Sequence, residues 1–173
     1  MTHRRAPARI VVRGATEDDA DTLEGFRCST GPWYERDVEE YVRARALREA
    51  LEKPSDYRLL LVLDDGRLTG CMAHALELLI EDAGPAIVAA RLHLLAIAIE
   101  DQGRRLEDGR RRSDLIVQAL IFDAFETRET EVLTAVVARE NLRSITLCER
   151  NGLRSQVSFD RRHIRLTGHF ARR

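Results

Sequence analysis

Five arginines surround the point where one apolar segment ends and another begins: Arg104, Arg105, Arg110, Arg111 and Arg112. The residues before them, 92–99, form a nearly continuous apolar run, which is typical of a strand covered on both faces. After them, Leu115, Ala119 and Phe122 recur at helical spacing. The first N–H groups of a helix bind anions, and arginine forks bind phosphate oxygens. The sequence therefore predicts a phosphate-binding loop here, with a merely solvated loop as the alternative.

Turn and capping residues divide the remaining chain into strands and helices. Strands are expected at 10–13, 57–63, 68–80, 86–99 and 132–138, with a closing hairpin from 154–159 and 163–170. Helices are expected at 17–28, 38–51, 113–127 and 142–150. The predicted helix starts are a capping box at Thr16 and N-caps at Ser113 and Asn141, while Asp65-Gly66 predicts a tight hairpin turn. This order indicates an α/β protein with a mixed sheet and helices on both faces.

The composition favours one globular domain. The 173 residues carry a formal net charge of −1 and are 44% hydrophobic, which disfavours a disordered chain and a dedicated nucleic-acid binder. Three cysteines without a CxxC pair disfavour disulfides and zinc. The sequence shows neither a secretory signal nor an apolar run long enough to span a bilayer. We expect a loose tail at 1–8, a single domain at 9–173 and a cytoplasmic location.

Three parts of the sequence resemble the GNAT superfamily of acyl-CoA N-acyltransferases. Residues 13–19, RGATEDD, are similar to its first strand and helix start, and residues 96–106, AIAIEDQGRRL, to its strand and pyrophosphate loop, Q/R-x-x-G-x-G/A. Residues 140–153, ENLRSITLCERNGL, resemble its E-N-x-x-[AS]…L-Y-E-R-x-G-F helix, the most specific of the three. There are two departures: Arg105 and Glu107 replace small residues of the loop, and Cys148 replaces the usual tyrosine.

The resemblance implies a fold and a reaction. The fold would be a mixed, mostly antiparallel sheet of about seven strands with helices on both faces. The reaction would be direct attack of a primary amine on the thioester of acetyl-CoA, a cosubstrate, with no metal. The resemblance also implies cofactor contacts on the fourth strand, in the loop and at the start of the late helix. In the loop, Gly109 and Ser113 would restore the small residues in a shifted register. The implied contacts are Leu95, Ala96, Ile97, Gln102, Gly103, Arg104, Arg105, Gly109, Arg110, Ser113 and Asn141.

The chemistry that the resemblance implies needs a base and a proton donor. His93 is the expected base, because it would share a strand face with Leu95 and Ile97 and its ordinary pKa suits neutral pH. His74 and Glu77 on the preceding strand are rivals, and a structural role is the alternative for all three.

Cys148 stands at the position of the family's general acid, and a small buried packing residue is the alternative. Trp33 and Tyr34 lie where similar proteins wall the acceptor site, although such aromatics are more often core residues. Glu77 completes the expected substrate-binding set.

Two other readings compete with the enzyme. The altered loop favours a catalytically inactive GNAT-fold interaction module with weak or lost CoA binding. The arginine loop could instead meet RNA or another polyanion, although the net charge makes nucleic acid an unexpected partner, and no membrane is expected. The acceptor stays open, and the closing hairpin could pair across a homodimer.

Overall fold

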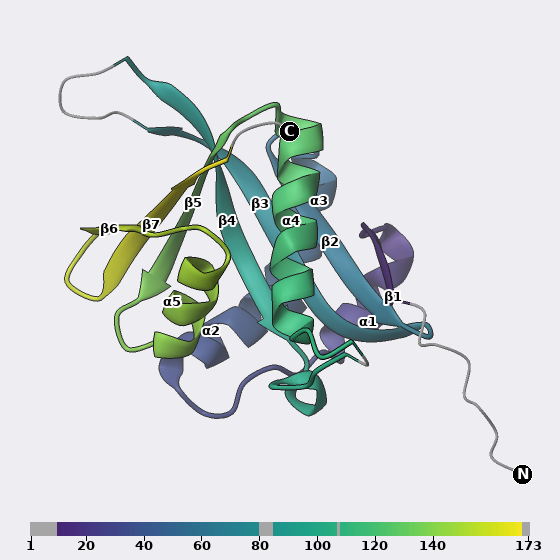
Figure 1. Ribbon diagram of the computed structural model, residues 1–173. Coiled ribbons are helices and arrows are strands. Elements are labelled where there is room, and N and C mark those ends of the chain that lie inside the picture. The colour runs from purple at the N-terminus through teal and green to yellow at the C-terminus, as the bar shows by residue number, and fades with distance from the viewer. Residues whose placement is uncertain (1–9, 80–84, 107, 171–173) are drawn as a thin grey trace, which may run out of the picture.

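The computed structural model describes residues 10–79, 85–106 and 108–170 (Figure 1). Within these residues seven strands form one sheet in the order β1-β2-β3-β4-β5-β7-β6. Neighbouring strands are antiparallel except for β4 and β5, which run parallel. The mixed, mostly antiparallel sheet expected from the sequence is confirmed. The strands are β1 (Ile10–Gly14), β2 (Tyr57–Asp64), β3 (Arg67–Leu79), β4 (Ile87–Ile97), β5 (Val132–Ala138), β6 (Ser155–Ser158) and β7 (His163–His169).

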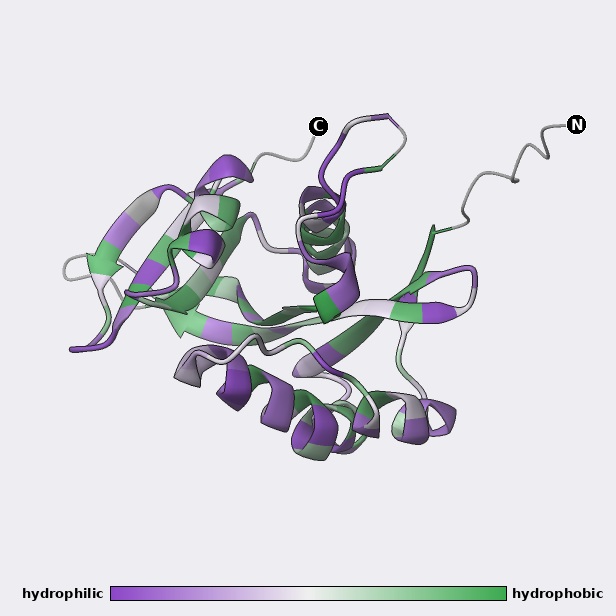
Figure 2. Ribbon diagram, turned by 90° about the horizontal axis from the view of Figure 1, so that it is seen from below, coloured by the Kyte–Doolittle hydropathy of each residue, from purple (hydrophilic) through white to green (hydrophobic). Residues whose placement is uncertain are grey.

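Helices cover both faces of the sheet (Figure 2). One face packs against α1 (Ala20–Glu24), α2 (Trp33–Tyr41), a π-helical turn (Val42–Ala46) and α3 (Leu47–Glu52). The other face packs against α4 (Arg112–Arg128) and α5 (Leu142–Arg150). Two short 3₁₀ turns, η1 (Glu17–Asp19) and η3 (Ile99–Asp101), precede α1 and follow β4.

Local sequence signals account for several element boundaries. The Thr16 N–H and hydroxyl both donate to Asp19 across 2.8 and 3.1 Å, as the capping box predicts. Asp65 and Gly66 both have positive φ, at 49° and 81°, as a tight hairpin requires. The Asn141 side chain accepts from the N–H of Ser144 across 3.0 Å, so this predicted N-cap is confirmed as well.

Several element boundaries differ from the predictions. The first helix ends at Glu24 rather than near Cys28. The second helical segment begins at Trp33, because Pro32 at its N-cap has the fixed φ that suits a helix start. α4 begins at Arg112 with Arg111 as its N-cap, so Ser113 is not the cap.

The expected tail at 1–8 lies outside the described residues. Within the described part of the chain, no helix combines the length and the apolar composition needed to cross a membrane. The three cysteines are free and buried, and no group of possible metal ligands is found among the described residues.

Candidate functional site

β4 and β5 lie side by side for only a short distance. Their parallel pairing joins Ala90–Leu92 to Leu133–Ala135, whereas β4 continues to Ile97 with antiparallel pairs to β3 alone. Figure 1 shows the two strands meeting at the top of the view and separating below it. The edge of β4 from His93 to Ile97 therefore has no strand partner on the β5 side among the described residues. Such an edge presents backbone N–H and C=O groups to an extended ligand.

A β-bulge at His93 determines which side chains of β4 face the α2 side of the sheet and which face the α4 side. Ala73 pairs with Leu94 and His74 with Leu92, so His93 is an extra residue in β4. Its ring packs against Tyr41 and Tyr57, with ring centroids 5.4 Å apart in both pairs. His93 thus faces the α2 layer.

Leu95 and Ile97 pack on the opposite face, against Ile116 of α4. The prediction that they share a face with His93 is wrong, because the bulge interrupts the alternation of the strand. Leu95, Ala96 and Ile97 nevertheless all lie on the open edge of β4, where the sequence places the cofactor arm.

The loop between β4 and α4 contains an inserted hairpin. Arg105 and Arg111 face each other as an isolated bridge, flanked by hydrogen bonds from the N–H of Leu106 to Arg110 O (2.8 Å) and from the N–H of Arg112 to Arg104 O (3.1 Å). Residues 104–106 and 110–112 therefore run antiparallel to each other. α4 can begin at the base of this hairpin.

Backbone donors gather at the hairpin base and the first turn of α4. The N–H groups of Gly103, Arg105 and Ser113 have no partner among the described residues. Gly103 has φ 75°, a left-handed conformation that turns the chain toward α4. Free N–H groups and the N-terminal end of a 17-residue helix dipole are features that favour an anion.

Arg112 does not add its side chain to these backbone donors. Its guanidinium is buried and donates to Asp101 (2.8 Å) and to Asp64 (2.5 Å). Arg67 donates to both carboxylate oxygens of Asp101 at 2.7 and 3.0 Å. These four residues, which we call the ion cluster, tie the start of α4 to β2, β3 and η3. Sequence analysis did not identify the cluster, although Asp101 directly precedes the arginine loop.

The other loop arginines have different environments. Arg105 donates to the carbonyl of Gly109 (2.8 Å) and Arg110 to the carboxylate of Asp108 (2.6 Å), so both bind within the hairpin. Arg104 is exposed, with Asp101 3.7 Å away. Arg111 is exposed too.

The side chain of Gln102 binds the backbone of two neighbouring segments and not the arginine loop. Its side-chain amide donates to the carbonyls of Cys28 (2.7 Å) and Ile97 (3.2 Å). Gln102 thereby fastens the end of β4 to the segment between α1 and α2.

Polar side chains line the α2 face of the sheet where β4 and β5 diverge. Thr134 donates to Glu77, and the other carboxylate oxygen of Glu77 lies 3.9 Å from Arg91 Nη1. Arg91 Nη2 lies 2.9 Å from His93 Nδ1. We call Thr134, Glu77, Arg91 and His93 the polar row.

The polar row fixes the state of His93. An arginine can only donate, so Nδ1 of His93 accepts and a neutral ring carries its proton on Nε2. Burial, and then the cation of Arg91, lower the pKa of His93 below its ordinary value. His93 is therefore neutral at pH 7, as a base must be, but Arg91 occupies its lone pair.

His74, the rival histidine, faces the other layer. It is fully buried, and its Nε2 lies 2.8 Å from Asp123 of α4. It does not reach the polar row. Glu77, in contrast, belongs to the row and lies on the side predicted for substrate.

Trp33 and Tyr34 stand at the first turn of α2, near the open end of the strand gap. The indole N–H of Trp33 donates to Glu140 across 3.2 Å, and its ring lies 5.9 Å from His163. Tyr34 packs edge-on against Trp33, at 5.6 Å. Both are half-buried, so neither is a core residue, and their role as acceptor contacts stays a prediction.

Cys148 of α5 lies in the core cluster with Leu147 and Leu153. It is 6% exposed, and burial raises the pKa of its thiol to about 11. A thiol of this pKa is a weaker acid than a free thiol, whose pKa is about 8.5. Its environment thus favours the packing role, and its role as a proton donor stays a prediction.

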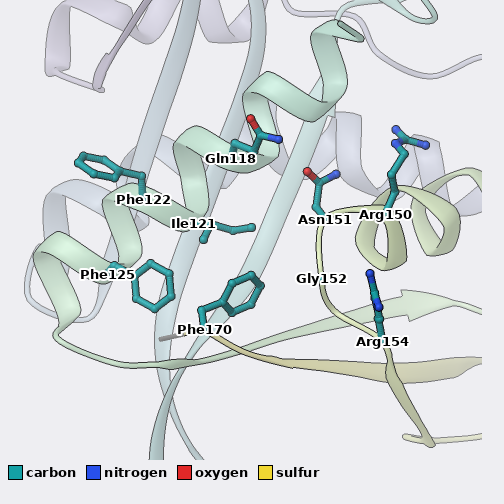
Figure 3. A pocket seen from close by; sticks show the side chains of 9 residues that line it. All are labelled: Gln118, Ile121, Phe122, Phe125, Arg150, Asn151, Gly152, Arg154 and Phe170. Atoms are coloured by element: carbon teal, nitrogen blue, oxygen red, sulfur yellow. The ribbon is translucent and has the colours of Figure 1, made fainter. Parts of the chain in front are cut away.

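A separate hollow of about 430 Å³ lies on the outer side of α4 and α5 (Figure 3). Phe122, Phe125 and Phe170 line one part of it, and Arg150 and Arg154 line another. None of its lining residues belongs to the polar row or to the open edge of β4.

Solved structures of N-acetyltransferases have this fold. The PaiA N-acetyltransferase from Thermoplasma acidophilum, in complex with coenzyme A, matches with a TM-score of 0.67 at 16% identity, over 94% of this chain and 99% of that chain. PseH from Campylobacter jejuni, in complex with acetyl coenzyme A, matches with a TM-score of 0.62 at 14% identity, over 94% and 100%. AtaT complexed with acetyl-methionyl-tRNAfMet matches with a TM-score of 0.67 at 16% identity, over 93% and 95%.

No protein-family model and no curated protein matches the sequence. Two further matching structures are described as GNAT-family acetyltransferases, at 16% and 24% identity. At these identities the likeness establishes the fold. The chain therefore has the fold of the GNAT N-acetyltransferases, as the resemblance predicted.

Proposed function

We propose that this chain is an acyl-CoA-dependent N-acetyltransferase that transfers the acetyl group of acetyl-CoA directly to a primary amine. The observation that carries the proposal is the divergence of β4 from β5 after Leu92, directly before the bulge at His93. It leaves an extended backbone edge for the pantetheine arm, ending at a loop and a helix start rich in free N–H donors.

Each part of the site has a role in this reaction. Gly103, Arg105 and Ser113 present N–H groups to the diphosphate, with exposed Arg104 nearby. The edge of β4 at Leu95–Ile97 pairs with the arm and holds the thioester, and a backbone N–H there stabilises the oxyanion. The ion cluster keeps the loop and α4 in register with the edge.

The polar row serves the acceptor. The amine nitrogen attacks the thioester carbonyl carbon, the C–N bond forms and the C–S bond breaks. The departing CoA sulfur takes up one proton, and the proton lost by the ammonium passes to His93 or water. His93 is the proposed base, and Trp33, Tyr34 and Glu77 are the proposed acceptor contacts.

Calorimetry with acetyl-CoA, CoA and longer acyl-CoAs tests the cofactor half of the proposal. We expect saturable binding of acetyl-CoA, followed by CoA thiol release when an amine panel is added. Absence of binding heat at millimolar acetyl-CoA, in protein whose thermal unfolding is cooperative, would contradict it.

The inserted hairpin supports a second candidate, an inactive GNAT-fold interaction module. Arg105 and Arg110 are bound within the hairpin, and Arg112 is engaged in the ion cluster. This leaves fewer cations for a diphosphate than the sequence suggests. The module would give no heat with any acyl-CoA, which separates it from the enzyme.

An RNA-borne amine is a further acceptor class to test. AtaT carries acetyl-methionyl-tRNAfMet in its complex, and Arg104 and Arg111 are exposed here. Binding to RNA would weaken steeply with salt. The net charge of −1 leads us to expect no such binding.

A further inference from the structure

We propose that the acceptor is a zwitterion of the amino-acid type, and that Arg91 binds its carboxylate beside the reacting amine. This inference rests on the proposed acetyl transfer and adds the chemical class of the acceptor.

The position of Arg91 is the first step. Arg91 pairs with Thr134 in the parallel register, one residue before the pairing of β4 and β5 ends. Its guanidinium thus lies at the apex of the strand gap, on the α2 face with His93. A thioester bound along the edge of β4 would present its carbonyl close to this apex.

The second step is the spare bonding capacity of Arg91. A guanidinium carries five N–H donors in a planar fork that matches a carboxylate. Its partners among the described residues are His93 Nδ1 at 2.9 Å and, beyond hydrogen-bonding range, Glu77 Oε2 at 3.9 Å. Its side chain is 33% exposed, so a ligand can reach the remaining donors.

Charge alternates along this face. Glu77 is held by Thr134 and lies 3.9 Å from Arg91, and Glu49 of α3 accepts across 2.8 Å from the hydroxyl of Tyr41, whose ring packs on His93. The ammonium group of a bound amino acid would therefore lie near a carboxylate of the protein, and its carboxylate would lie near Arg91. An amine that lacks a carboxylate would place its ammonium group near the guanidinium of Arg91 with no negative charge of its own to offset the repulsion.

A bound carboxylate would also change His93. Arg91 now donates to Nδ1, and a carboxylate that draws the guanidinium away would free this nitrogen to take the ammonium proton. The charged and titratable groups around His93 are Arg91 of β4, Glu49 of α3, Tyr41 of α2 and Tyr57 of β2, and Glu77 of β3 lies 3.9 Å from Arg91. The acceptor would thereby activate its own base.

Matched acceptors test the inference. Phenylalanine, arginine and glutamate are each compared with the methyl ester of the α-carboxylate and with the amine that lacks this carboxylate, in the presence of acetyl-CoA. We expect kcat/KM for at least one free amino acid to exceed that of its ester and its amine at least tenfold. Arg91→Met should abolish this preference, Arg91→Lys should keep part of it, and Arg45→Met, at an exposed arginine of the π-helical turn, should leave it unchanged.

Two further readouts separate binding from folding. Acetyl-CoA affinity by calorimetry should be the same in all four proteins, which shows that the variants are folded. The acidic limb of kcat should lie at higher pH for the free amino acid than for its ester, and Arg91→Met should remove this difference.

Each other outcome counts against the inference. Equal or faster acetylation of esters or simple amines overturns it, and a preference for esters would indicate aminoacyl esters as acceptors. A preference for free acids that survives in Arg91→Met overturns it too, as does acetyl-CoA binding without acetylation of any free acid. Lack of acetyl-CoA binding by the parent protein instead refutes the proposed function on which the inference rests.

Discussion

Arg112 donates through Nη1 to Oδ1 of Asp101 across 2.8 Å at the first turn of α4, and neither side chain is more than 9% exposed. A cation at a helix N-terminus opposes the helix dipole, so its carboxylate partners are what make it tolerable there. The pair holds the start of α4 in place, and this is where the diphosphate is proposed to bind.

Asp101→Ala should therefore destabilise the protein strongly. It leaves Arg112 buried with Asp64 alone and removes the two bonds from Arg67 to Asp101, so that Arg67 keeps only Glu100 among the described side chains. Breaking a buried pair costs about 3–5 kcal/mol. The free energy of unfolding in urea measures this, and Glu52→Ala, in the exposed pair with Arg48 at 4.0 Å, should cost no more than about 0.5 kcal/mol. A loss below about 1 kcal/mol for Asp101→Ala would show that the cluster contributes little.

Ser113→Glu should weaken acetyl-CoA binding about tenfold or more. The new carboxylate would stand at the helix N-terminus beside the free N–H of Ser113, where the diphosphate is expected. The same charge interacts favourably with the helix dipole, by about 0.3–1 kcal/mol, so thermal stability should not fall. Gln118→Glu, further along α4, is the control in calorimetry. Unchanged affinity of Ser113→Glu would place the diphosphate elsewhere.

His93→Asn should remove the acidic limb of the rate profile. In the unliganded parent protein burial and Arg91 lower the pKa of His93, so this limb of kcat/KM should lie below pH 6.5. We expect kcat to fall by about 100-fold, a typical contribution of a general base. A variant that retains both the rate and the limb would show that His93 is not the base.

Cys148→Ser should cost stability more than activity. A thiol with a pKa of about 11 is a weaker acid than the CoA thiol that leaves, so proton transfer from Cys148 to the leaving thiolate is unfavourable and its loss should change the rate little. We expect kcat within about threefold of the parent and a loss of about 1–2 kcal/mol in urea from the buried hydroxyl. A hundredfold loss of kcat in the folded variant would reinstate Cys148 as the donor.

Asp19 should make the protein sensitive to acid. Its hydrogen bonds with Arg13 are the largest cause that lowers the pKa of this carboxyl, from 3.8 to about 2. A lowered pKa stabilises the folded state above pH 3.8, by about 2 kcal/mol, and this stabilisation is lost as the pH falls from 3.8 through 2. Urea unfolding between pH 2 and 6 measures it. Asp19→Asn should flatten that slope, and Asp21→Asn, at an exposed position of α1, should leave it intact.

The sequence predicted the features that depend on neighbours in the chain. The cap at Asn141 and the Asp65-Gly66 turn are of this kind, because each is built from residues within three positions. The likeness of 96–106 to a pyrophosphate loop directed attention to the end of β4, and its role in cofactor binding stays a prediction.

Features that depend on distant partners were not predicted. The bulge at His93 exists only in the register with β3, so periodicity alone put His93 on the wrong face. Arg112 binds Asp64, which lies 48 residues earlier in the chain. The number of arginines in the loop could not show that Arg112 is buried. Arg91 lay beside the predicted base, but its contact with His93 needs the bulge.

The short parallel pairing of β4 and β5 lets the two halves of the sheet change their relative orientation during evolution. Backbone pairing fixes β1–β4 as one unit and β5–β7 as another, while only Ala90–Leu92 and Leu133–Ala135 join them. The angle between the units is left to side chains, such as the contacts of Arg150 with Asp114 and of Trp33 with Glu140. Exchanging those few side chains would change the angle between the two units without shifting any strand register, so the space beside the β4 edge can vary while each unit of the sheet stays intact.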